Sequence, residues 1–402
     1  MQTQILPRYL STAEGREADA ILRACVHCGF CTATCPTYQL LGDELDGPRG
    51  RIYQIKQVLE GHAPTRITQG HLDRCLTCRS CETTCPSGVR YGRLADIGRH
   101  LVEEQVERPL NERLLRSALV ALVPHPKRFG ALAALGRLAR PLLPAKLAAK
   151  VPNPRPAGVW PQPRGRKQVL VLAGCVQSVA TPLTNAAAAR VLDRLGFDLV
   201  AVPEAGCCGA AAYHLNAQTE GLDAMRRNID AWWPKIDSGC EAILVTASGC
   251  GVMVKDYGEL LRHDPEYADK AARVSALARD PAELLAGLDL AALGRPGQGR
   301  RIAFHPPCTL QHGQKITGVT ESILTEVGFT LTPVPDAHLC CGSAGTYSIT
   351  QPELSQRLLA EKVGALESGG PELIATANIG CQLHLEAGSA LPVVHWLELL
   401  DS

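Results

Sequence analysis

The chain has 402 residues, more than one hydrophobic core usually contains, so we expect two or three domains. Its 41 Lys and Arg residues nearly cancel its 40 Asp and Glu residues, and this balance argues against a nucleic-acid partner. The unusual feature is the 17 cysteines, because a protein of this size does not need disulfides for stability. Metal ligation is therefore the leading explanation for the cysteines.

The start of the chain and its longest uncharged run bear on its location. Residues 1–19 contain neither a basic start followed by an apolar stretch nor a small-residue cleavage site, so we predict a cytoplasmic protein. Residues 169–189 are uncharged but include Gln177, Thr181 and Pro182, which favours a strand, a loop and the start of a helix. An integral membrane subunit is not expected.

Two four-cysteine motifs near the N-terminus have the spacing of bacterial ferredoxins that hold two 4Fe-4S clusters. In that pattern three closely spaced thiolates bind one cluster, and the fourth, which precedes a proline, reaches the neighbouring cluster. The first cluster is therefore predicted on Cys25, Cys28, Cys31 and Cys85, and the second on Cys75, Cys78, Cys81 and Cys35. The alternative is a pair of zinc sites, but zinc ligands are usually grouped as two pairs of residues.

The segment between the two motifs is predicted to be helical around residues 50–60. Arg49 and Arg51 come just before or at the start of this helix and could place positive charge near the clusters. Such charge would raise the reduction potentials by stabilising the added electron. A solvated turn that opens a helix explains the same residues equally well.

The chain divides into four predicted segments. Residues 1–112 form a mainly helical, ferredoxin-like domain, residues 113–166 form a basic, helical and proline-rich linker, and residues 167–299 and 300–402 form two related domains. Twelve Arg or Lys residues and no acidic residue lie between Arg113 and Lys167. The N-terminal half of this stretch suits a basic amphipathic helix that rests on an anionic membrane or a partner subunit. The alternative is a solvated face packed on the protein's own domains.

The two C-terminal segments repeat one another. Cys175, Cys207 and Cys208 recur as Cys308, Cys340 and Cys341 at an offset of 133 residues, and Cys250 recurs as Cys381 at an offset of 131. Each repeat begins with a β-rich run, at residues 168–174 and 301–305, and contains helical stretches such as 184–195 and 354–367. We therefore predict a multidomain α+β and α/β protein in which each repeat is a small layer with parallel strands.

Each repeat carries four candidate metal ligands, which are Cys175, Cys207, Cys208 and Cys250 in the first and Cys308, Cys340, Cys341 and Cys381 in the second. Adjacent cysteines suit a metal centre, with Gly209 and Gly342 allowing the backbone to turn tightly. The pattern resembles the cysteine-rich CCG domain family, also found in heterodisulfide reductase subunits, which usually ends in Cys-x-x-Cys. Here Ala247 and Asn378 stand where the first cysteine of that pair is expected. A further iron-sulfur cluster, a zinc ion and buried structural thiols all remain open.

Several single residues near these cysteines could take part in a centre. Histidines 27, 305, 312, 338 and 384 could ligate or tune it, although hydrogen-bonded structural histidines are the commoner case. Cys240 has no equivalent in the second repeat, and we interpret it as an ordinary thiol.

Whole phrases around the cysteines resemble the glycolate oxidase (glycolate dehydrogenase) iron-sulfur subunit family. They comprise residues 21–36, 42–51, 247–251, 308–312 and 339–347, and the resemblance runs over essentially the full length. It implies an electron-transfer subunit that works with a flavin-containing, glycolate-oxidising subunit and a second flavoprotein-like subunit, with a membrane quinone as the expected acceptor. No catalytic residue is expected on this chain, since it has no Gly-x-Gly-x-x-Gly dinucleotide fingerprint.

Three other functions compete with this one. The iron-sulfur subunits of anaerobic glycerol-3-phosphate dehydrogenase and of lactate-oxidising complexes share the ferredoxin and double CCG layout. A zinc or iron-sulfur scaffold or sensor would bind a partner without turnover. Catalysis at the CCG centres, as in heterodisulfide reductase, is disfavoured by the missing fifth thiols.

Overall fold

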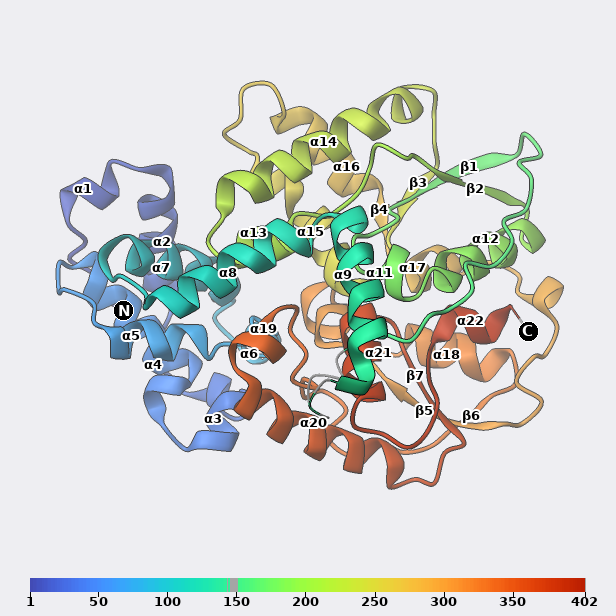
Figure 1. Cartoon of the computed structure of the whole chain (residues 1–402). Coiled ribbons are helices and arrows are strands. Elements are labelled where there is room, and N and C mark those ends of the chain that lie inside the picture. The colour runs from blue at the N-terminus through green and yellow to red at the C-terminus, as the bar shows by residue number, and fades with distance from the viewer. Residues whose placement is uncertain (143, 145–150, 402) are drawn as a thin grey trace. The chain divides into compact units, whose positions relative to one another are not determined.

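The computed structural model describes residues 1–142, 144 and 151–401 (Figure 1). It contains two compact units, of which the first comprises residues 1–117 and 338–358 and the second comprises residues 118–337 and 359–402. Leu143 and Lys146 of the predicted basic segment lie outside the described residues.

The first unit is helical in its described residues. Prolines occupy the first helical position of α3 and α4, where the missing amide hydrogen is not needed. The helices bury a core that includes Ile55, Leu59 and Leu94. The elements are α1 (Pro7–Leu10), α2 (Ala13–Ala24), η1 (Phe30–Thr32), α3 (Pro36–Leu41), η2 (Glu44–Asp46), α4 (Pro48–Leu59), α5 (Arg66–Asp73), α6 (Ser80–Thr84), α7 (Tyr91–Gln105) and α19 (Tyr347–Thr350). The helix predicted around residues 50–60 is thus present as α4.

The second unit contains two four-stranded parallel sheets. The first has the order β2-β1-β3-β4, and the second has the order β6-β5-β7-β8, so equivalent strands of the two repeats occupy equivalent places. The strands are β1 (Lys167–Val171), β2 (Phe197–Ala201), β3 (Ala242–Leu244), β4 (Ala278–Arg279), β5 (Arg301–His305), β6 (Thr330–Leu331), β7 (Leu373–Thr376) and β8 (Val393–His395). The predicted duplication and the predicted parallel strands are both present (Figure 1).

Helices separate the strands of each sheet, as a parallel arrangement requires. In the first repeat they are α11 (Gln177–Ala180), α12 (Leu183–Arg194), α13 (Ala210–His214), α14 (Gln218–Asp237), α15 (Ser248–Leu260), α16 (Ala268–Leu277), α17 (Pro281–Leu285) and η4 (Ala291–Leu293). In the second they are the π-helical η5 (Thr309–Gly313), α18 (Val319–Glu326), α20 (Pro352–Glu367), α21 (Ile379–Glu386) and α22 (Trp396–Leu400).

Side chains alternate across the first sheet because successive residues of a strand face opposite sides. Val169 and Val171 join a core that also contains Ile302 and Phe304 of the second sheet. Leu170 and its neighbours on the opposite face pack in a separate core against α14, α15 and α16. The two repeats are therefore joined through one shared hydrophobic core.

The N-terminal part of the basic segment is helical, in α8 (Leu110–Leu122), α9 (Pro126–Ala139) and η3 (Arg140–Leu142), whereas residues 151–166 form neither helix nor strand. Leu132, Leu135 and Leu138 of α9 are exposed to solvent. No helix among the described residues has the length and apolar character needed to cross a bilayer.

Trp232 of α14 tests the packing of the second unit, because its side chain is fully buried while the adjacent Trp233 is only half-buried. We expect Trp232→Ala to lower the free energy of unfolding by about 3–5 kcal/mol, since it removes apolar contacts and leaves a cavity. Trp233→Ala is the matched control and should cost less than about 1 kcal/mol. Urea denaturation of the full chain measures both values, and equal effects would contradict this description of the core.

Candidate metal centres

The first cavity of the helical unit is lined by four cysteines that sequence spacing assigns to one cluster. Cys25, Cys28, Cys31 and Cys85 all border it, and so does Cys81, which the sequence assigns to the other cluster. Cys25 follows α2 and Cys85 follows α6, so the ligand set combines residues 60 positions apart. Four converging thiols are the donor set that a 4Fe-4S cluster requires, so these residues fit that group.

The second cavity has the complementary composition. It is bordered by Cys35, which caps the start of α3, together with Cys75, Cys78 and Cys81. Tyr91, at the start of α7, lines both cavities and is buried. The residues around this cavity also fit a four-thiolate cluster.

The two cysteine loops have the same backbone form although their sequences differ. His27 and Gly29 in the first loop have φ values of 55° and 87°, and Thr77 and Arg79 in the second have values of 52° and 59°. Left-handed residues at these positions turn backbone amides toward sulfur, as seen where Thr77 N donates to Cys75 Sγ at 3.4 Å. Non-glycine residues in this conformation are strained, and such strain is typical of ligand-binding loops.

Fixed positive charge surrounds the second cavity. Burial by itself would raise the pKa of Cys75, but the charges of Arg51 and Arg99 outweigh it and the pKa is lowered. Arg99 of α7 also donates to Cys75 O at 2.6 Å and to Thr77 Oγ1 at 2.8 Å. Around Cys81, by contrast, burial raises the pKa well above its usual value. The surroundings therefore favour the thiolate form of Cys75 and the protonated thiol form of Cys81.

Arg51 is held in place by a buried network. Its guanidinium donates to His71 O at 2.7 Å and to Thr37 Oγ1 at 3.1 Å, and it pairs with Asp46 at 3.5 Å. Asp46 also accepts from Arg74 at 2.9 Å, which offsets the cost of burying its carboxylate. Arg51 thus lies in the first turn of α4 and places charge by the cavity. Arg49 is more exposed and pairs with Glu44 at 2.6 Å.

The four cysteines of the first repeat come together at the carboxyl ends of β1, β2 and β3, where parallel sheets bind ligands. Hydrogen bonds from Cys175 and Cys208 lower the pKa of Cys207. Hydrogen bonds with Cys207 and then Cys250 raise the pKa of Cys208. Cys250 lies in the first turn of α15. The sulfurs thus form one continuous, mostly buried group.

The Cys-Cys-Gly turns of both repeats depend on glycine. Gly209 and Gly342 have φ values of 91° and 87°, and each donates its amide to the first sulfur of its turn, at 3.5 and 3.4 Å. A Cβ at these positions would lie 2.6 Å from Gly221 O and 2.7 Å from Ser355 O respectively. The tight turns predicted from the sequence are therefore present, and no other residue type fits them.

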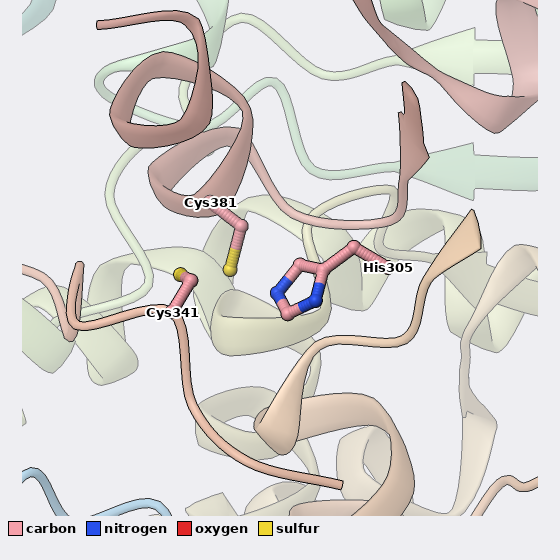
Figure 2. A group of neighbouring side chains, drawn as sticks. All are labelled: His305, Cys341 and Cys381. Atoms are coloured by element: carbon pink, nitrogen blue, oxygen red, sulfur yellow. The ribbon is translucent and has the colours of Figure 1, made fainter. Parts of the chain in front are cut away.

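In the second repeat, a histidine, His305, lies beside Cys381 (Figure 2). His305 ends β5, and one of its ring nitrogens lies within 4.8 Å of the sulfur of Cys381. Burial lowers the pKa of His305 to about 3, so the ring is neutral at physiological pH. Cys308 and Cys381 are buried in the second unit, while Cys340 and Cys341 belong by packing to the first.

The residues that replace the expected fifth thiols lie where the two repeats meet. Asn378 Oδ1 accepts from Gly249 N at 3.2 Å, and its amide nitrogen lies 3.5 Å from Cys381 Sγ. Ala247 packs with Ala180 and Ile379 in a small buried cluster. Both positions therefore serve the junction between the repeats.

Other residues singled out from the sequence have simpler surroundings. Cys240 is buried in the core against α14 to α16, as expected of an ordinary thiol. His27 borders the first cavity, and His312 and His384 are buried. Sequence reasoning missed Tyr91 and Arg99, because no motif marks them and only the fold of α7 brings them to the cysteines.

Comparison with known proteins extends this description. The 4Fe-4S dicluster domain model matches residues 21–89, and the cysteine-rich domain model CCG matches residues 169–255 and 302–386. The glycolate oxidase iron-sulfur subunit of Escherichia coli K12 is 59% identical over 100% of this chain and 98% of the relative. The chain belongs to the glycolate oxidase iron-sulfur subunit family.

More distant relatives agree with this assignment. A probable glycolate oxidase iron-sulfur subunit of Bacillus subtilis is 32% identical over 90% of this chain and 88% of the relative. Lactate utilization protein A of Geobacillus kaustophilus is 28% identical over 58% of this chain and 99% of the relative. The resemblance, the fold class and the presence of 4Fe-4S clusters predicted from the sequence are confirmed. The predicted domain boundaries and individual ligands stay predictions.

Cys35→Ser tests the crossed ligand assignment. Because Cys35 borders the second cavity with Cys75 and Cys78, the variant should lose the cluster signal of that cavity and keep the other. Electron paramagnetic resonance and iron analysis of the reduced chain would measure a loss of up to about four irons. Cys240→Ser is the control and should leave both clusters intact. Damage confined to the cluster on Cys25, Cys28 and Cys31 would refute the crossing.

Proposed function

We propose that this chain carries electrons from a flavin-containing subunit that oxidises glycolate to glyoxylate toward a downstream acceptor, a membrane quinone. The observation that supports this most strongly is the 59% identity to a glycolate oxidase iron-sulfur subunit over the full length. Two cavities lined by cysteines within one helical unit give the chain the means for single-electron transfer.

The ligands we propose are those of the crossed pattern, Cys25, Cys28, Cys31 and Cys85 for one cluster and Cys75, Cys78, Cys81 and Cys35 for the other. When bound, 4Fe-4S clusters accept and release one electron at a time. The chain's own residues hold them, exclude water around Cys81 and Tyr91, and supply positive charge from Arg51 and Arg99. That charge stabilises the reduced state and so raises the potential at the second cavity.

The loop around Cys28 suits the approach of an electron-transfer partner. Cys28 is exposed, and the side chains of Val26 and Phe30 beside it are 67% and 60% exposed. Large apolar side chains that surround a redox site without burial are typical of a docking surface. The flavin and the substrate base would lie on the partner subunits, including a second flavoprotein-like subunit.

The second candidate function is lactate oxidation, favoured by the similarity to lactate utilization protein A. That similarity covers 58% of this chain at 28% identity, against full coverage at 59% for the glycolate relative. Glycolate is therefore the substrate we propose for the complex. We place the complex in the cytoplasm, attached reversibly to the inner face of the membrane.

The assembled complex tests the proposed electron path. We expect the chain alone to show no glycolate oxidation with an artificial acceptor, because it supplies ligands but no hydride acceptor. With the flavin-containing subunit present, glycolate should bleach the clusters, and L-lactate and glycerol 3-phosphate should not. Loss of either cluster should stop acceptor reduction while glycolate still bleaches the flavin once. Turnover by the flavin-free chain, or bleaching by lactate alone, would contradict the proposal.

The exposed leucines of α9 beside basic residues suggest how the complex attaches to a membrane. Each basic residue near an anionic bilayer contributes at most about 1 kcal/mol, so attachment should be reversible and sensitive to salt. We expect the complex to float with anionic liposomes at low salt and to be released at high salt.

Replacing Lys127, Arg128, Arg137 and Arg140 with Gln should abolish this flotation. A matched control removes the same charge from exposed residues elsewhere, at Arg16, Lys235, Arg273 and Lys315, and should float like the unmodified complex. Equal flotation of both variants would remove this segment from the explanation.

A further inference from the structure

His305 is a buried histidine whose two ring nitrogens both lack a hydrogen-bond partner. Its side chain is 1% exposed, at the carboxyl end of β5, next to the shared hydrophobic core. A neutral imidazole has one donor and one acceptor, and burying both without partners is costly. A buried polar group without a hydrogen-bond partner needs an explanation, and a bound metal ion supplies one.

His395 shows what a structural histidine looks like in the same sheet. It ends β8, is also 1% exposed, and its Nε2 lies 2.9 Å from Thr246 O while its Nδ1 accepts from Leu397 N at 3.2 Å. Both nitrogens are thus satisfied within the protein. His305 differs from it in polar contacts and not in burial.

One ring nitrogen of His305 faces the sulfur of Cys381 (Figure 2). The ring points toward Cys381, which lies in the first turn of α21, and the donor atoms lie within 4.8 Å of each other (Figure 2). A metal atom bound to one thiolate at about 2.3 Å and one imidazole at about 2.0–2.1 Å spans a distance close to this. One metal atom can therefore bind both side chains after a small closure.

The charge around His305 suits thiolate ligands. Lys362 is 3% exposed, and its ammonium group lies close enough to add to the lowering of the His305 pKa that burial causes. The ammonium donates to Asp336 O at 2.7 Å, which fixes its position. A fixed buried cation offsets the negative charge that thiolates bring to a metal.

The first repeat cannot form the same site. At the 133-residue offset of the cysteines, Leu172 occupies the position of His305, and its side chain packs in the hydrophobic core. The cysteine pattern is otherwise the same in both repeats. The two repeats therefore differ at one position at the end of a strand, where only the second repeat has a side chain that can bind a metal.

We propose that His305 is a metal ligand of the second repeat, which holds a mixed imidazole and thiolate centre together with Cys381. Cys308, which lies in the same compact unit, is a candidate for a further position through its place in the repeated sequence. Both zinc and iron accept this donor set. The inference stands whichever substrate the complex oxidises.

The test uses the full chain purified without oxygen, with iron, zinc and sulfide counted per chain. His305→Gln should lower the count of one metal, while the signals of the two ferredoxin-type clusters stay unchanged. His395→Gln is the control, because it changes an equally buried histidine that is already hydrogen-bonded, and it should keep the full metal count.

His305→Cys is a second variant, which distinguishes loss of a metal ligand from a folding defect in His305→Gln. It should retain the metal, because a thiolate replaces the imidazole, but it should lose the nitrogen ligand. Pulsed electron paramagnetic resonance detects that nitrogen on iron, and X-ray absorption detects it on zinc. An unchanged metal count in His305→Gln, or no nitrogen ligand in the unmodified chain, overturns the proposal. A count that falls equally in His395→Gln also overturns it.

Discussion

Burial of thiolate sulfur beside fixed positive charge and backbone amides is the constraint on which the structure depends. Anionic sulfur is costly to remove from water unless opposite charge or hydrogen bonds compensate it. In the helical unit, Arg51 and Arg99 supply that charge to Cys75. The network that holds Arg51, through Asp46, in turn joins α4 to α5 and η2. The core of this unit is therefore organised around its ligands.

The two repeats meet the same constraint by a different route. Their cysteines follow the carboxyl ends of parallel strands, where helix N-termini and turn amides face a common edge. Gly209 and Gly342 direct an amide to sulfur in each Cys-Cys-Gly turn. The Cys-Cys-Gly turn thus supplies a backbone hydrogen bond to sulfur in both repeats.

Duplication left the two repeats equivalent in topology but different in chemistry. They share one hydrophobic core, so a change in the packing of one sheet affects the packing of the other. Ala247 and Asn378 serve the junction between them. At one strand end, the second repeat has the polar His305 where the first repeat has the apolar Leu172, so the two repeats offer different donor atoms there.

The sequence by itself determined the number of cysteine motifs, the duplication, the parallel strands and the helix that α4 provides. These follow from spacing and periodicity, which are local properties of the chain. Only the tertiary structure decided that Tyr91 and Arg99 border the cysteines, and that His395 is hydrogen-bonded while His305 is not. Charge compensation and hydrogen bonding depend on groups that folding brings together from distant positions, and no local pattern records those partners.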